Sequence, residues 1–116
     1  RAAILFLLAK TLYYNGSRVT VPFEESDLYE KVTCLAASIE IAHNSSLLQD
    51  DIIDHSDERR SEVAAHVIHG RSNAVFASNF MIARASRMLT HVFADSPHMS
   101  QLFSTILYNL VFGELI

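Results

Sequence analysis

Residues 28–54 read LYEKVTCLAASIEIAHNSSLLQDDIID, and their apolar side chains recur at the spacing of an α-helix. The stretch ends in three carboxylates, Asp50, Asp51 and Asp54. Residues four apart share a helix face, about 5–6 Å apart at Cβ, so Asp50 and Asp54 are expected to form a pair. Negative charge is unfavourable at a helix C-terminal end, because the helix dipole is already negative there. We therefore expect a positive ligand at this end.

The chemistry of the side chains at this helix end favours a metal ion and a phosphate group. Oxygen ligands without Cys or His beside them suit Mg²⁺, which typically takes one or two protein carboxylates together with phosphate oxygens and water. Arg59 and Arg60 follow shortly after the carboxylates, and their planar guanidinium groups match phosphate geometry. We interpret the stretch as a metal–diphosphate site. For the carboxylates taken alone, the alternative is a solvated acidic helix end.

The composition limits the class of protein. The chain has 116 residues, of which half are hydrophobic and 19% are charged, as in a globular domain with a modest core. The net charge of −4 argues against a nucleic-acid surface. The single Cys34 cannot form an internal disulfide, and its apolar setting favours a buried residue over a reactive thiol. No apolar run approaches the ~20 residues of a membrane span. We expect a soluble intracellular protein, either cytoplasmic or mitochondrial.

The remaining sequence predicts further helices, so the expected fold class is all-α. Neither end of the chain has a cap or stop signal, which indicates one segment, residues 1–116, of a longer helical bundle. We expect its other helices downstream, and one or more upstream. Asp27 has the spacing of a helix N-cap, Ser72 is a second candidate cap, and Ser96-Pro97 marks a third helix start. The polar residues 55–61 are expected to form a turn. The other predicted helices cover residues 2–14, 63–69, 73–93 and 97 to the end.

The residues around the carboxylates resemble a known family. The run EIAHNSSLLQDDIID, residues 40–54, with Arg59-Arg60 and Ala65-His66, resembles the first aspartate-rich region of trans-isoprenyl diphosphate synthases, above all the long-chain polyprenyl diphosphate synthases. The segments 77–85 and 113–115 are also similar to the family. The resemblance covers essentially the whole chain, and it implies a helical bundle of the isoprenoid synthase type.

The resemblance implies a role for each residue of the site. Asp50 and Asp54 would hold Mg²⁺ that bridges to an allylic diphosphate, with Asp51 supporting them. Arg59 would contact the same diphosphate. Isopentenyl diphosphate would be held by His43, Arg60 and Arg1. Taken alone, such a histidine is more often a hydrogen-bonded core residue, and it is the spacing of His43 to Asp50 that favours the ligand role.

The implied activity is that of a Mg²⁺-dependent prenyltransferase, which condenses isopentenyl diphosphate with an allylic diphosphate. In the family the product grows along the helix before the carboxylates, and bulky residues there stop it early. This chain has Ser46, Ser45 and Ala42 at the wall positions. We therefore expect a long product, in the range of a quinone side chain. The alternative is that these small residues only permit close helix packing.

Three residues depart from the family pattern. Ser61 stands where the family has Gly, Glu62 where it often has a basic residue, and Asn79 where it has Asp. The second aspartate-rich motif of the family is also absent from these residues. The departures support an alternative function, a non-catalytic helical subunit of a heteromeric prenyl diphosphate synthase, whereas the intact carboxylates and arginines favour the enzyme. In either case the wide apolar helix faces predict a homodimer or heterodimer.

Overall fold

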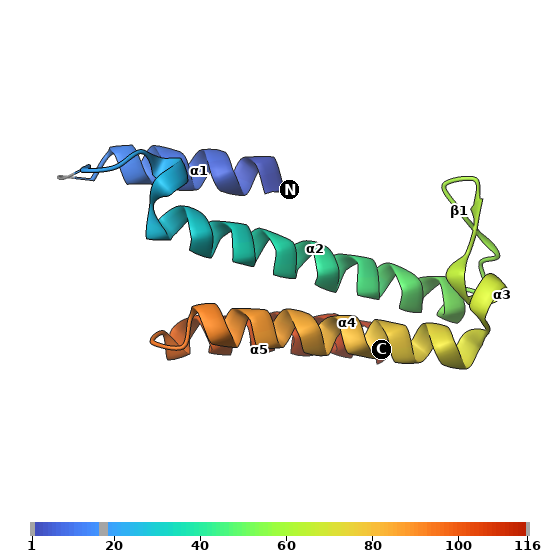
Figure 1. The fold of residues 1–116 in the computed structure, drawn as a ribbon. Coiled ribbons are helices and arrows are strands. Elements are labelled where there is room, and N and C mark those ends of the chain that lie inside the picture. Colours follow the sequence, from blue (N-terminus) through green and yellow to red (C-terminus); the bar gives the residue numbers. More distant parts are fainter. Residues whose placement is uncertain (1, 17–18, 116) are drawn as a thin grey trace. The chain divides into compact units, whose positions relative to one another are not determined.

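A computed structural model describes residues 2–16 and 19–115, with only the backbone of Glu114 and Leu115. Arg1, a predicted isopentenyl diphosphate ligand, lies outside the described residues. The structure is all-α, as predicted, apart from one very short hairpin (Figure 1). In chain order the elements are α1 (Ala2–Tyr14), η1 (Phe23–Glu25), α2 (Asp27–Ile53), β1 (Glu58–Arg59), β2 (Glu62–Val63), α3 (Ala65–His69), α4 (Arg71–Val92) and α5 (Pro97–Leu115).

The chain divides into two compact units. One comprises Arg1–Ala36 and Ser86–Ile116, and the other comprises Ala37–Ala85, so α2 and α4 each contribute to both. A core cluster of the first unit consists of the buried Ala9, Phe23 and Val32, with aliphatic and aromatic side chains packed against them. Phe23 is buried, and its ring lies 5.6 Å from that of Tyr13 and 5.4 Å from that of Tyr29. Its amide also donates a hydrogen bond to the Tyr14 hydroxyl. Phe23 therefore joins the segment after α1 to α1.

The start of α2 is set by Ser26 and not by the predicted cap, Asp27. The Ser26 hydroxyl accepts a hydrogen bond from the Tyr29 amide at 3.2 Å, the arrangement of a helix N-cap, and donates one to the Phe23 carbonyl. Asp27 is the first helical residue. There its negative charge is favourable, because the N-terminal end of the helix dipole is positive. The predicted cap was wrong by one residue.

The later helix boundaries follow local signals, with one correction. α3 ends at His69, and the next residue, Gly70, has a φ of 86°, in the left-handed region that glycine adopts readily. α4 begins directly after it, with the Ala74 amide donating to the Gly70 carbonyl, so Ser72 lies inside the first turn and does not cap the helix. The start of α5 at Pro97, after Ser96, is as predicted.

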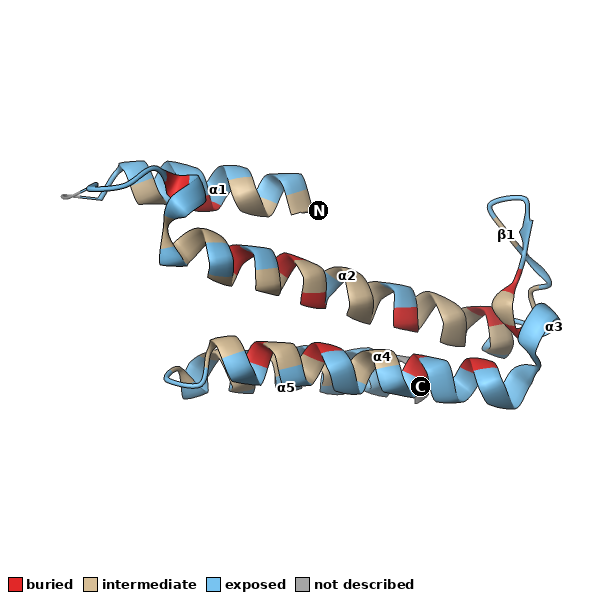
Figure 2. Ribbon diagram, in the orientation of Figure 1, coloured by how far each residue is buried: buried red, intermediate tan, exposed pale blue. Residues whose placement is uncertain are grey.

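The second unit is held together by small residues where α2 meets α4. Ser45 of α2 and Ser78 of α4 are both fully buried, and their hydroxyl oxygens lie 2.8 Å apart. The Ser45 hydroxyl also reaches the Ser78 carbonyl at 2.9 Å, and the Ser78 hydroxyl reaches the Ser45 carbonyl at 3.2 Å. Side chains of this size let two helix backbones approach closely. Figure 2 marks the buried positions along both helices.

None of the helices that the structure describes is both long and apolar enough to cross a bilayer.

Candidate metal–diphosphate site

The carboxylates at the end of α2 have the predicted helical relation. The Asp54 amide donates a hydrogen bond to the Asp50 carbonyl at 2.8 Å, so helical hydrogen bonding continues to Asp54 although α2 ends at Ile53. Asp50 is half-buried and Asp54 is exposed, whereas Asp51 is only 4% exposed. The three carboxylates therefore differ in environment: two are accessible to a ligand, and one is enclosed by the protein.

Asp51 is enclosed because it binds Arg59. The Arg59 Nε lies 3.0 Å from Oδ1 and 2.9 Å from Oδ2 of Asp51, and Nη2 lies 2.7 Å from Oδ1. These hydrogen bonds from Arg59 hold the pKa of Asp51 below its usual value. The same bonds, with the charges of Asp51, Asp50 and Asp54, raise the pKa of Arg59. The guanidinium group thus lies in the field of all three carboxylates.

The hairpin that brings Arg59 to the helix has a strained turn. β1 and β2 pair antiparallel, with Arg59 opposite Glu62, and the turn between them consists of Arg60 and Ser61. These residues have φ values of 50° and 66°, and positive φ at both central residues is typical of the two-residue turns that fit a hairpin twist. Ser61 stands where the resemblance implies a glycine, and it adopts at a cost a conformation that glycine adopts freely.

The other predicted ligands are less closely joined to the carboxylates. His43 is half-buried and lies about 10 Å before Asp50 along the axis of α2. Its carbonyl accepts a hydrogen bond from the Ser46 hydroxyl at 2.6 Å. Arg60 is exposed at the tip of the hairpin. The structure thus brings together the carboxylates and Arg59, while the roles of His43 and Arg60 stay predictions.

The three residues predicted to line a product channel differ in position. Ala42 and Ser46 are half-buried, and their role stays a prediction. Ser45 is occupied by its contact with Ser78, which favours the close-packing alternative at this position. Ser45 lies five residues before Asp50, and five residues of a helix leave the two side chains about 140° apart around its axis. Ser45 and Asp50 therefore lie on different sides of α2.

Sequence reasoning gave no role to two histidines of this unit. His66 is buried, and its Nε2 lies 3.9 Å from Asp57 Oδ1. Within the part of the chain that the structure describes, its Nδ1 has no hydrogen-bond partner. The Nδ1 of His55 lies 3.2 Å from Nη2 of Arg71. The resemblance pointed to Ala65-His66 only as part of the motif, and sequence spacing carries no signal for either contact.

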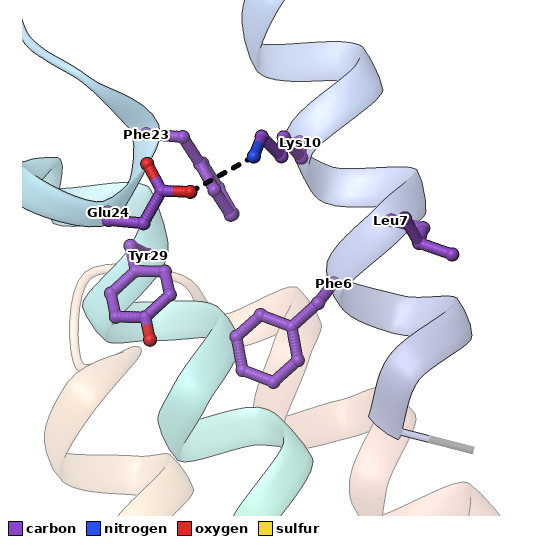
Figure 3. A pocket seen from close by; sticks show the side chains of 6 residues that line it. All are labelled: Phe6, Leu7, Lys10, Phe23, Glu24 and Tyr29. Carbon is purple, nitrogen blue, oxygen red and sulfur yellow. Dashed lines mark hydrogen bonds and ion pairs between the residues drawn. The ribbon is translucent and has the colours of Figure 1, made fainter.

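A separate pocket lies in the first unit. It has a volume of about 310 Å³, and Figure 3 shows the ion pair at its edge, in which Lys10 Nζ lies 3.1 Å from Glu24 Oε1. The pocket is lined by Phe6, Leu7, Lys10, Phe23, Glu24 and Tyr29. The hydrogen bond to Glu24 raises the pKa of Lys10. The pKa of Glu24 is lowered, mainly by a backbone hydrogen bond and then by the hydrogen bond from Lys10.

The donor atoms at the end of α2 fit Mg²⁺ shared with a substrate. Among the described residues, no group of three or more His, Cys, Asp or Glu side chains is placed to hold a metal ion. Asp50 and Asp54 provide two carboxylates, which is the number that Mg²⁺ takes when phosphate oxygens and water complete its octahedral shell. The site suits a metal that arrives with a diphosphate.

Comparison with known proteins identifies the family of this chain. The family model described as polyprenyl synthetase matches residues 1–116. The chain belongs to the polyprenyl synthetase family. Among its relatives is decaprenyl-diphosphate synthase subunit 1 of Schizosaccharomyces pombe, 37% identical over 71% of this chain and 21% of the relative. The probable mitochondrial hexaprenyl pyrophosphate synthase of Neurospora crassa is 36% identical over 88% of the chain and 22% of the relative.

The relatives are much longer than this polyprenyl synthetase chain and differ in named product. The short chain isoprenyl diphosphate synthase of Methanocaldococcus jannaschii is 35% identical over 76% of the chain and 29% of the relative. The chain thus spans between about a fifth and three tenths of the length of these relatives. Both long-chain and short-chain synthases are similar to it, so membership of the family does not fix the product.

Proposed function

We propose that this chain supplies the first metal–diphosphate site of a prenyl diphosphate synthase, which condenses isopentenyl diphosphate with an allylic diphosphate. The observation that carries the proposal is the arrangement at the end of α2. Asp50 and Asp54 are one helical turn apart and accessible, and Asp51 between them binds Arg59. The family and the names of the relatives support the same reaction class.

Different residues would bind the two substrates. Asp50 and Asp54 would hold Mg²⁺, which when bound supplies positive charge to the leaving diphosphate. Arg59 would face the allylic diphosphate, while Arg60 and His43 would hold isopentenyl diphosphate. The allylic C–O bond breaks with its electron pair leaving on diphosphate. The double bond of isopentenyl diphosphate then forms the new C–C bond, and a proton is lost to the departing diphosphate.

Substitution of the accessible carboxylates tests the proposal. In the full-length protein we expect Asp50→Asn and Asp54→Asn each to slow turnover by at least ~10²-fold, as loss of a preorganised electrostatic group does. The measurement is product formation from both substrates across a Mg²⁺ titration. Asp95→Asn, an exposed carboxylate in the turn before α5, is the matched control and should leave turnover unchanged. Near-normal turnover of Asp54→Asn at limiting Mg²⁺ would contradict the assignment.

Product length is a second part of the proposal. Ala42 and Ser46 leave the side of α2 before the carboxylates open, so we propose a long product. Chromatography of the products of the full-length enzyme should show chains well beyond fifteen carbons, and Ala42→Phe should shorten them. Asn44→Phe, which places the same ring on an exposed position of α2, is the control. A fifteen-carbon product from the wild type, or an unchanged length in Ala42→Phe, would show that this side does not line the channel.

The same assay separates the enzyme from the alternative of a non-catalytic subunit. A full-length protein that forms product without a partner chain is an enzyme. One that forms product only when a second synthase chain is added would fit the alternative.

A further inference from the structure

The middle carboxylate of the motif differs from its neighbours in what it binds. Asp51 is 4% exposed, and both of its oxygens accept hydrogen bonds from Arg59. In the described residues the side chains of Asp50 and Asp54 form no hydrogen bond, and they act on Arg59 only through their charge. One guanidinium group therefore neutralises Asp51 specifically. To become a metal ligand, Asp51 would have to break this pair.

The contact also closes a loop of the chain. Arg59 lies eight residues after Asp51, on β1 of the hairpin. The base of the loop is fixed by its backbone, since the Ser56 amide donates to the Asp51 carbonyl at 2.9 Å and the Ala64 amide donates to the Asp57 carbonyl at 2.8 Å. These bonds leave the direction of the Arg59 side chain undetermined. The forked pair with Asp51 is what directs it.

The arrangement also affects the neighbouring arginine. Arg60 is the first residue of the turn, and both turn residues have the positive φ that non-glycine residues rarely adopt. A turn that is unfavourable by itself persists only when the surrounding structure determines it. The Asp51–Arg59 pair anchors the strand immediately before this turn, so it helps to fix where Arg60 is presented.

We propose that Asp51 is a positioning residue, which orients Arg59 and the turn that carries Arg60, while Asp50 and Asp54 hold the metal. The proposal rests on the proposed function for its consequence in catalysis. It assigns Asp51 to the arginine and not to the metal shell. Asp50 and Asp51 are adjacent and chemically identical, but they have different tasks because they face different sides of the helix end.

Kinetics of the full-length enzyme test the assignment by a double-mutant cycle. Asp51→Asn should raise the KM for the allylic diphosphate on the order of tenfold, as loss of hydrogen bonds to a charged group does, with a smaller change in kcat. In an Arg59→Gln background the same substitution should add less than about twofold, because its partner is already gone. Asp51→Glu, which keeps the charge, should recover part of the loss. Glu58→Gln, an exposed carboxylate of the same hairpin, is the matched control.

Two outcomes would overturn the proposal. If Asp51 is a metal ligand, Asp51→Asn will raise the Mg²⁺ concentration for half-maximal activity, and its effect will multiply with that of Arg59→Gln. If the pair is only structural, Asp51→Asn will lower the melting temperature and leave the KM values of the folded enzyme unchanged.

A substrate-free measurement keeps the inference separate from the proposed function. In the NMR spectrum of the full-length protein, the Arg59 Nε–H should be protected from solvent exchange in the wild type and lose that protection in Asp51→Asn. An unprotected Nε–H in the wild type would refute the contact, whatever the enzyme catalyses. Protection without any prenyl transfer by the wild type would instead refute the proposed function and leave the contact standing.

Discussion

The two units of the chain are held together by different means. In the first unit, the ring of the buried Phe23 packs edge to face against that of Tyr29 and at a tilt against that of Tyr13. In the second, Ser45 and Ser78 join α2 to α4 through paired hydroxyls and backbone carbonyls. Aromatic rings provide a large buried area, and their favourable arrangements span ring separations of about 4.5–7 Å. Hydroxyl pairs bury little area, but they fix the distance and rotation of two helices.

The difference bears on where the candidate site lies. The carboxylates and Arg59 belong to the unit with the serine contact, residues Ala37–Ala85. Side chains that must meet a diphosphate need positions fixed to within a fraction of an ångström, which directional hydrogen bonds between closely packed helices provide. The first unit can stabilise its helices without that requirement. The comparison predicts that damage to the first unit lowers stability without changing the site, whereas damage to the second costs less stability when a side chain is truncated but disturbs the geometry of the site.

The largest effect on stability is expected from Phe23→Ala. Removal of a buried phenyl ring typically lowers the free energy of unfolding by about 3–5 kcal/mol, through lost burial and the cavity left behind. Denaturant unfolding of the full-length protein measures it. The KM values of the fraction that remains folded should be unchanged, because Phe23 makes no described contact with the carboxylates.

Val19→Ala is the control for this substitution. Val19 is 41% exposed in the segment just before η1, and its truncation should change the free energy of unfolding by less than about 0.5 kcal/mol. Altered KM values in Phe23→Ala, at a temperature where the variant is folded, would break the proposed separation between the units.

The helices were predictable from the sequence because their signals are local. Asn15-Gly16, Gly70 and Ser96-Pro97 punctuate the chain, and α1 and α5 begin or end beside them as predicted. The hairpin was predicted only as a turn, because two strands of two residues have no periodicity to detect. The choice of Ser26 over Asp27 as the cap of α2 depends on backbone direction, which a spacing rule does not contain.

For the candidate site, the sequence predicted how the carboxylates are spaced on α2, but not which contacts they make. Helical spacing was enough to pair Asp50 with Asp54, since both lie on one element. The bond between Asp51 and Arg59 depends on the left-handed turn at Arg60, and the sequence gives little indication of that conformation at a non-glycine residue. The burial of Ser45 depends on which helix packs against α2. Helical spacing predicts which residues share a helix face, but it does not predict which other element packs against that face.

A smaller effect is expected from the serine contact. Ser45→Ala should lower the free energy of unfolding by about 1 kcal/mol, the net value of a typical hydrogen bond. The Ser78 hydroxyl keeps the Ser45 carbonyl as an acceptor, so it is not left without a partner. The double variant Ser45→Ala/Ser78→Ala should cost less than the sum of the two single variants, because the hydroxyls bind each other.

Strict additivity in that cycle would show that the two hydroxyls act independently. The same contact predicts that Ser45→Phe lowers stability by about 1–3 kcal/mol, because the ring has no space between the helices. Ala42→Phe is the better probe of product length for this reason.

The smallest effect is expected at the ion pair beside the pocket of the first unit. Lys10 and Glu24 have side chains that are 49% and 53% exposed. Exposed pairs contribute little, because water already solvates both charges and ordering two flexible side chains costs entropy. Lys10→Met keeps the length of the stem that lines the pocket and removes the charge. Its unfolding midpoint should equal that of the wild type within measurement error, and any difference should disappear at high salt, where surface charges are screened. A loss as large as that of Ser45→Ala, persisting at high salt, would show that the first unit also depends on a directional polar contact, and the contrast between the two units would then be wrong.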